Sequence, residues 1–159
     1  MKSFSILSAV VGAALMASPG MAAQVRDHPK AVLELFPSQG CSSCPQADLK
    51  FNELGKNPEL ITLAYHVDYW DYIGWTDTFG AKAYSDLQKT YAQSWGSSRI
   101  YTPELVVNGA KGVVGSRDKE VTEAIGAASL SLPVGLNVGD SMLDVTDGPQ
   151  AGGSDAMVW

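Results

Sequence analysis

Hydrophobic residues along the chain alternate between short continuous runs and segments with helical spacing. Continuous apolar runs of four to eight residues are typical of buried strands, and they predict strands at residues 30–36, 60–67, 104–107 and 111–114. Apolar residues that recur every three or four positions are typical of amphipathic helices, and they predict helices at residues 44–54, 81–95 and about 116–128. The order of these elements predicts an α/β domain with a central sheet.

Polar residues and glycines mark where several of these elements end. Gly55 is followed by Lys-Asn-Pro, which predicts the end of the first helix. Asn108-Gly109 between two apolar runs predicts a tight hairpin. Ser116 is expected to cap the last helix, whose first turn carries Asp118 and Glu120 near the positive end of the helix dipole.

The first 23 residues have the pattern of a secretory signal peptide. Lys2 precedes an apolar core at residues 4–15, and small residues follow at 18–23. The apolar core is shorter than the roughly 20 residues that a membrane span needs. We expect cleavage after Ala22 or Ala23 and a periplasmic or secreted protein. An uncleaved N-terminal anchor is the alternative.

The charge balance excludes some classes of partner. The full chain has a formal charge of -6, and removal of residues 1–23 takes away Lys2 and no acid, which leaves about -7. An acidic protein repels phosphate backbones and anionic lipid surfaces. We therefore expect no nucleic-acid partner and no membrane association after signal cleavage.

The chain has two cysteines, Cys41 and Cys44, in the phrase Gly-Cys-Ser-Ser-Cys-Pro. They lie between the first predicted strand and the first predicted helix. A Cys-x-x-Cys pair there is typical of thiol–disulfide exchange, because the N-terminus of the helix stabilises a thiolate. A structural disulfide is the alternative in an exported protein. The very short loop and the single pair favour redox chemistry.

The order of the elements and a second motif resemble the thioredoxin fold. Residues 101–109 read Tyr-Thr-Pro-Glu-Leu-Val-Val-Asn-Gly, which is similar to the segment of that fold in which a cis Thr-Pro bond enters a strand. The resemblance implies a central mixed sheet flanked by helices, with a helical and aromatic insertion. It also implies a cis bond at Thr102-Pro103, for which an ordinary trans turn is the alternative.

The phrases at residues 34–45, 66–71 and 101–103 resemble a secreted bacterial family catalogued as domain of unknown function 1223. Its members usually continue into a further β-rich segment. We therefore expect a signal peptide at 1–23, a thioredoxin-like domain at 24–130 and a partial, poorly packed β-rich segment at 131–159. The sequence ends within an apolar run, so a fragment is expected.

The resemblance also implies roles for particular residues. Cys41, at the exposed end of the helix, would be the nucleophile, and Cys44 beneath it would resolve the mixed disulfide. Ser42-Ser43 between them adds no positive charge, which favours a mild or reducing potential. Glu34 matches a buried acid that moves protons below the second cysteine, although alternation could equally place it on a solvated face.

Other residues are candidates for binding. We expect Thr102, Pro103 and Trp70 to contact the substrate. The neighbouring aromatic residues of 69–79 could extend this groove or pack in the core. His66 and Asp68, in a His-x-Asp phrase, could join the two thiols in a copper or zinc site. A hydrogen-bonded structural role for His66 is the favoured alternative.

We interpret the sequence as an exported thiol–disulfide oxidoreductase. Its expected partners are protein or small thiol and disulfide substrates and an unidentified redox partner, and it needs no cofactor. Two alternatives remain. One is a copper or zinc binding or delivery protein that uses the same thiols with His66. The other is a non-catalytic binding module with a structural disulfide.

Overall fold

The computed structural model describes residues 29–130, 134–138 and 143–147. Its elements follow in the order β1 (Ala31–Phe36), α1 (Cys44–Leu54), β2 (Leu60–Ala64), the short 3₁₀ helix η1 (Asp71–Ile73), α2 (Lys82–Ser94), β3 (Glu104–Val107), β4 (Lys111–Val114) and α3 (Asp118–Gly126). The sheet has the strand order β2-β1-β3-β4. Strand β1 is parallel to β2 and antiparallel to β3, and β3 is antiparallel to β4. This mixed sheet with its helices is a thioredoxin-like α/β fold, as predicted.

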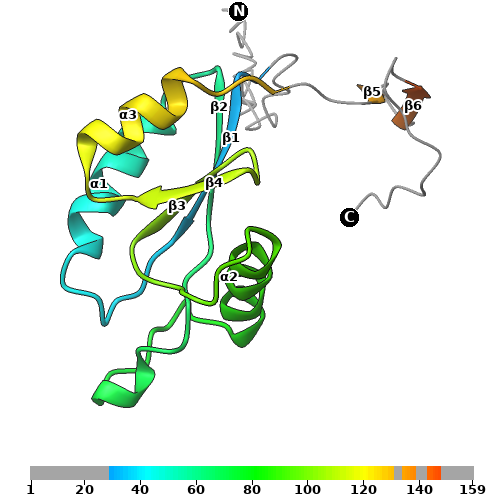
Figure 1. Ribbon diagram of the computed structural model, residues 1–159. Coiled ribbons are helices and arrows are strands. Elements are labelled where there is room, and N and C mark those ends of the chain that lie inside the picture. The colour runs from blue at the N-terminus through cyan, green and yellow to red at the C-terminus, as the bar shows by residue number, and fades with distance from the viewer. Residues whose placement is uncertain (1–28, 131–133, 139–142, 148–159) are drawn as a thin grey trace, which may run out of the picture.

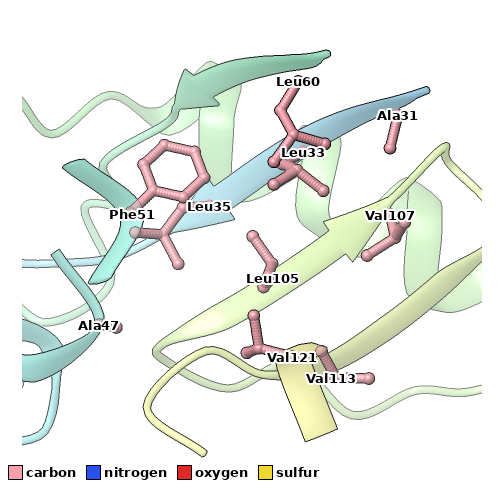
Figure 2. Close-up of a cluster of buried hydrophobic side chains, with 10 residues drawn as sticks. All are labelled: Ala31, Leu33, Leu35, Ala47, Phe51, Leu60, Leu105, Val107, Val113 and Val121. Atoms are coloured by element: carbon pink, nitrogen blue, oxygen red, sulfur yellow. The ribbon is translucent and has the colours of Figure 1, made fainter. Parts of the chain in front are cut away.

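Each face of the sheet packs against helices. Helices α1 and α3 cover one face, and α2 covers the other (Figure 1). Alternate residues of a strand point to opposite faces, so Leu33 and Leu35 of β1 join the core beneath α1 and α3, which Figure 2 shows. Phe36 faces α2 and packs with Val67 and Val106. Ala47 and Phe51 of α1 and Val121 of α3 lie in the first cluster, and Leu87 and Tyr91 of α2 pack against the second.

The predicted hairpin between β3 and β4 is confirmed. Asn108 and Gly109 have φ angles of 52° and 66°, the left-handed conformation that asparagine and glycine tolerate best. Asn108 also fastens the hairpin to β1, because its side-chain Oδ1 accepts a 2.8 Å hydrogen bond from the Val32 amide. The Asn108 amide in turn donates to the Val32 carbonyl at 2.9 Å.

Two element boundaries differ from the prediction. Strand β2 ends at Ala64, although the Val67 amide still donates to the Pro37 carbonyl at 2.9 Å. The chain therefore continues beside the extension of β1 without forming a regular ladder. Ser116 does not cap α3: the N-cap is Arg117, whose guanidinium pairs with Glu120 at 2.7 Å.

Strands β5 (Val134–Val138) and β6 (Leu143–Asp147) form an antiparallel pair of their own, separate from the four-stranded sheet. The boundary at residue 130 remains a prediction. The expected signal peptide and most of residues 131–159 lie outside the described residues. Within the described ranges, no helix has the length and hydropathy of a membrane span.

Candidate functional site

The two cysteines form a disulfide at the start of α1. After β1 the chain turns so that the Cys41 amide donates to the Ser38 carbonyl at 3.1 Å and the Cys44 amide donates to the Cys41 carbonyl at 3.2 Å. The Cα atoms of the two cysteines are 5.4 Å apart. Cys44 is the first residue of α1, and the first turn of this helix holds no acidic residue. The amide groups of the helix N-terminus therefore face no carboxylate of their own turn, which favours a thiolate after reduction.

Both sulfur-bearing residues are largely enclosed. Cys41 is 4% exposed and Cys44 is 1% exposed. Cys41 is thus the more accessible of the two, but it is less open than the sequence led us to expect. The Ser43 hydroxyl lies 3.7 Å from the Cys41 sulfur. The order in which the two sulfurs react remains a prediction.

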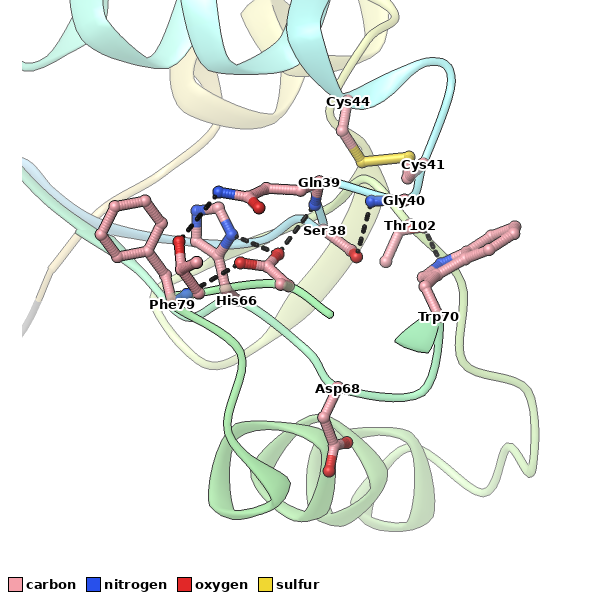
Figure 3. A network of polar contacts seen from close by, with 12 residues as sticks. Ser38, Gln39, Gly40, Cys41, Cys44, His66, Asp68, Trp70, Phe79 and Thr102 are labelled. Atoms are coloured by element: carbon pink, nitrogen blue, oxygen red, sulfur yellow. Dashed lines mark hydrogen bonds and ion pairs between the residues drawn. A yellow bond between two sulfur atoms is a disulfide. The ribbon is translucent and has the colours of Figure 1, made fainter. Parts of the chain in front are cut away.

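The predicted cis bond at Thr102-Pro103 is confirmed. Thr102 lies beside the cysteine loop, and its hydroxyl accepts a 2.8 Å hydrogen bond from the Trp70 indole (Figure 3). Gly40, just before Cys41, lets the cysteine loop lie close to Trp70 and Ile73. A Cβ at this position would lie 3.0 Å from Cβ of Trp70 and 3.1 Å from Cδ1 of Ile73. The structure therefore brings Cys41, Cys44, Thr102 and Trp70 together.

The aromatic segment at residues 69–79 divides between core and surface. Tyr69 and Trp70 pack partly against the cluster beneath α2. Tyr72, Trp75 and Phe79 are 82%, 60% and 66% exposed, more than core packing would leave. Trp75 is held beside the cysteine loop, because its indole donates to the Gln39 side chain at 2.9 Å. The segment thus places one exposed ring, that of Trp75, against Gln39 of the cysteine loop.

Asp77 holds this segment against the cysteine loop, and no sequence motif indicates this role. Its Oδ2 accepts a hydrogen bond from the Gln39 amide at 2.7 Å and pairs with Nδ1 of His66 at 2.8 Å. Its Oδ1 accepts from the Phe79 amide at 2.9 Å. Burial raises the pKa of Asp77, but the hydrogen bonds from His66, Gln39 and Phe79 outweigh this and hold it below the usual value.

The structure does not gather the residues of the hypothetical metal site. His66 pairs with Asp77, and Figure 3 shows its ring beside Gln39 and Phe79, away from the two sulfurs. Asp68 instead accepts a hydrogen bond from the hydroxyl of Ser85 in α2. In the part of the chain that the structure describes, no three His, Cys, Asp or Glu side chains are placed to hold a metal ion. His66 makes the hydrogen bond that the structural alternative expects, and the choice between the two roles remains a prediction.

Glu34 is buried, not solvated, and its side chain lies on the α2 face of the sheet. It is 8% exposed, and its Oε2 accepts a 2.7 Å hydrogen bond from the hydroxyl of Tyr91 in α2. Burial raises the pKa of Glu34, and the Tyr91 hydrogen bond partly opposes this. Because α1 lies on the opposite face, the structure does not pair Glu34 with Cys44. Its role in proton transfer remains a prediction.

Glu104 is a second buried acid on the α2 face. It begins β3 and is 3% exposed, and its Oε2 accepts a 2.7 Å hydrogen bond from the buried Gln88 side chain. Burial raises the pKa of Glu104, while hydrogen bonds from Gln88 and Tyr101 act in the opposite direction. The signal that could have identified it is the one that drew attention to Glu34, a glutamate within an apolar strand.

The family described as Protein of unknown function (DUF1223) matches residues 32–159. The chain belongs to this family. The crystal structure of protein AGR_C_4864 from Agrobacterium tumefaciens is similar, with a TM-score of 0.65 and 34% identity over 77% of this chain. The match spans 57% of the length of that protein. No curated protein matches the chain. These comparisons establish family and fold and assign no reaction.

Proposed function

We propose that this protein is a thiol–disulfide oxidoreductase that uses the Cys41–Cys44 pair. The observation that carries the proposal is the place of the disulfide: it joins Cys41, just before α1, to Cys44, the first residue of α1, where helix amides favour a thiolate, and it lies beside Thr102. A pair that served only to stabilise the fold would close a loop of two residues, which constrains the unfolded chain little.

The exchange proceeds in two steps. A substrate thiolate attacks the Cys41 sulfur, a substrate–Cys41 bond forms, and the Cys41–Cys44 bond breaks with Cys44 leaving as a thiolate that takes up a proton. A second substrate thiolate then attacks the substrate sulfur and releases Cys41. The substrate dithiol is oxidised to a disulfide, and the protein gains two electrons. The reverse sequence reduces a substrate disulfide, with Cys41 as the nucleophile and Cys44 as the resolving thiol.

The residues next to the disulfide fit an extended peptide as substrate. In the described residues, neither the amide nor the carbonyl of Thr102 has a hydrogen-bond partner. A substrate strand can pair with such free backbone groups. Trp70 bonds to Thr102, the Tyr72 ring is stacked beside it with centroids 6.5 Å apart, and the exposed Trp75 bonds to Gln39 of the cysteine loop. These rings offer apolar contact to the side chains of a substrate.

The proposal includes export, because Lys2 and the apolar residues 4–15 match a signal peptide. Expression of the full chain in a bacterium, followed by fractionation and mass spectrometry, tests this. The expected periplasmic species begins at residue 23 or 24. Full-length protein in the cytoplasm would contradict export, and it would leave the thiol chemistry to be judged by the next experiment.

A direct test mixes the oxidised protein with an extended peptide that contains two cysteines. The fluorescence of this peptide changes when its cysteines are oxidised. We expect stoichiometric oxidation of the peptide and reduction of the Cys41–Cys44 pair. Cys41→Ser should abolish the transfer, and Ser42→Ala, an exposed neighbour, should retain it as the matched control. Absence of transfer from the intact disulfide, or equal transfer by Cys41→Ser, would overturn the proposal.

A further inference from the structure

A cavity of about 620 Å³ lies on the α2 face of the sheet, next to Thr102 and apart from the two sulfurs. It is formed by the end of α2, the loop that follows, and strands β3 and β4. Its lining includes Trp95, Arg99, Tyr101, Thr102, Glu104 and Gly112. A cavity of this volume is within the range of small-ligand sites.

Glu104 gives this cavity one buried acidic group. Gln88, which is fully buried, donates from its side-chain amide both to Oε2 of Glu104 at 2.7 Å and to the Tyr101 carbonyl at 2.8 Å. Gly112 of β4 leaves room for the other carboxyl oxygen, because a Cβ at this position would overlap Oε1 of Glu104. The same Cβ would lie 3.1 Å from Cζ3 of Trp95. A glycine therefore lets the acid and the indole meet at the cavity.

The walls of the cavity are aromatic. The Trp95 ring is stacked on Tyr91, with ring centroids 5.5 Å apart and an interplanar angle of 17°, which fixes the orientation of the indole. Tyr101 is 36% exposed at the cavity. Aromatic faces attract cations, and more strongly when water is displaced. They also provide apolar contact for an aliphatic chain.

Charge selects among ligands of this size. A bound anion would meet the buried Glu104 carboxyl, with which no cation forms an ion pair within the residues that the structure describes. A bound ammonium group would provide that cation and could donate to the carboxyl oxygens. Arg99 also borders the cavity, but it is exposed, so water and salt screen its charge.

We propose that this cavity binds a primary ammonium group on an aliphatic stem, with Glu104 as its counter-ion and Trp95 and Tyr101 as its walls. Binding of a free alkylamine in this cavity does not depend on the proposed thiol–disulfide exchange. That the ammonium belongs to a lysine side chain of a substrate peptide rests on the proposed function, since Thr102 borders both the cavity and the cysteine loop.

Calorimetric titration of the full chain with its disulfide intact tests the site. The probes are n-butylammonium, N-acetyl-lysine methylamide and N-acetyl-norleucine methylamide, the last being the uncharged match of the lysine probe. We expect both ammonium probes to bind at least ten-fold more tightly than the norleucine probe. Tighter binding of the lysine probe than of butylammonium identifies a peptide source, and equal binding identifies a free amine. The same affinity for the norleucine and lysine probes, or no binding of any ammonium probe, would overturn the proposal.

A pair of variants locates the binding. Glu104→Gln keeps the side-chain shape and an acceptor for Gln88, and it should weaken butylammonium binding at least ten-fold. Glu59→Gln removes the same charge from an exposed loop residue and should bind as the unaltered chain does. Equal weakening in both variants would mean that net charge, not Glu104, attracts the amine. Because these titrations use no thiol, a failed exchange experiment would leave them unaffected, so the two proposals fail separately.

Discussion

The electrostatics of the Cys41 site can be tested by placing one negative charge beside it. Ser43 is exposed and occupies the N-cap of α1 without a side-chain cap hydrogen bond. Its hydroxyl lies 3.7 Å from the Cys41 sulfur, so Ser43→Asp brings a carboxylate to about this distance. Two like charges about 4 Å apart repel by about 1 kcal/mol in water and by about 4 kcal/mol at an effective dielectric constant near 20.

Because Ser43 is exposed, the lower part of this range applies, about 1–2 kcal/mol. One pH unit corresponds to about 1.4 kcal/mol, so the midpoint of Cys41 alkylation should rise by about one pH unit. The thiolate fraction at pH 7 should fall about ten-fold. The reduction potential should become more negative by about 20–40 mV, because the charge destabilises the reduced form and 30 mV corresponds to about 1.4 kcal/mol.

Ser43→Asn is the matched control, because asparagine and aspartate have similar shapes and are equally good N-caps. The assay is iodoacetamide alkylation of the reduced protein between pH 6 and pH 9, with each cysteine followed by mass spectrometry. We also expect Cys41 to react faster than Cys44 in the unaltered protein. Identical profiles for the Asp and Asn variants, or faster alkylation of Cys44, would refute the reasoning.

Four other substitutions test the disulfide, the buried Glu34–Tyr91 pair and Asp77. Cys44→Ser should accumulate mixed disulfides through Cys41, visible on non-reducing gels; a variant that releases substrate as fast as the unaltered chain would contradict the resolving role. Burial raises the pKa of Glu34, so its ionisation destabilises the folded state as pH rises. Glu34→Gln should therefore raise the free energy of unfolding at pH 8 relative to the unaltered chain and change it least at pH 4, measured with urea. Tyr91→Phe should cost about 1.5–3 kcal/mol at pH 8, since it removes the hydrogen bond to the Glu34 carboxylate, and equal costs at pH 4 and pH 8 would argue against an ionised partner. The pKa of Asp77 is lowered, so its contribution is present at neutral pH and is lost as pH falls below about 3.8. Asp77→Asn should cost about 2 kcal/mol at pH 7, and a urea series should show that difference shrinking toward pH 3.

The fold could be predicted largely because its signals are local. The apolar runs of β1 and β3 and the Asn108-Gly109 turn each specify their own conformation within a few residues. The Cys-x-x-Cys phrase likewise needs only the strand before it and the helix after it. Boundaries were less predictable: the N-cap of α3 is Arg117, not Ser116, and it makes no side-chain cap hydrogen bond.

The partners of the site residues could not be predicted, because they are far apart in sequence. Tyr91 is 57 residues from Glu34, and Asp77 is 38 residues from Gln39. Such pairs depend on how α2 and the aromatic segment pack on the sheet, which no periodicity specifies. A glutamate within an apolar strand indicates that the acid is buried and needs a hydrogen-bond partner. Only the packing of α2 on the sheet shows that this partner is Tyr91.

The reduction potential of the Cys41–Cys44 pair tests the central claim most directly. The full chain is equilibrated with defined ratios of reduced and oxidised glutathione, and with dithiothreitol for the lower potentials, and the fraction reduced is measured by alkylation and mass spectrometry. We predict full and reversible conversion with a midpoint between about −270 and −180 mV, the range from thioredoxin to protein disulfide isomerase. A midpoint below about −300 mV, as structural disulfides have, or a pair that does not reoxidise, would contradict the assignment as an oxidoreductase.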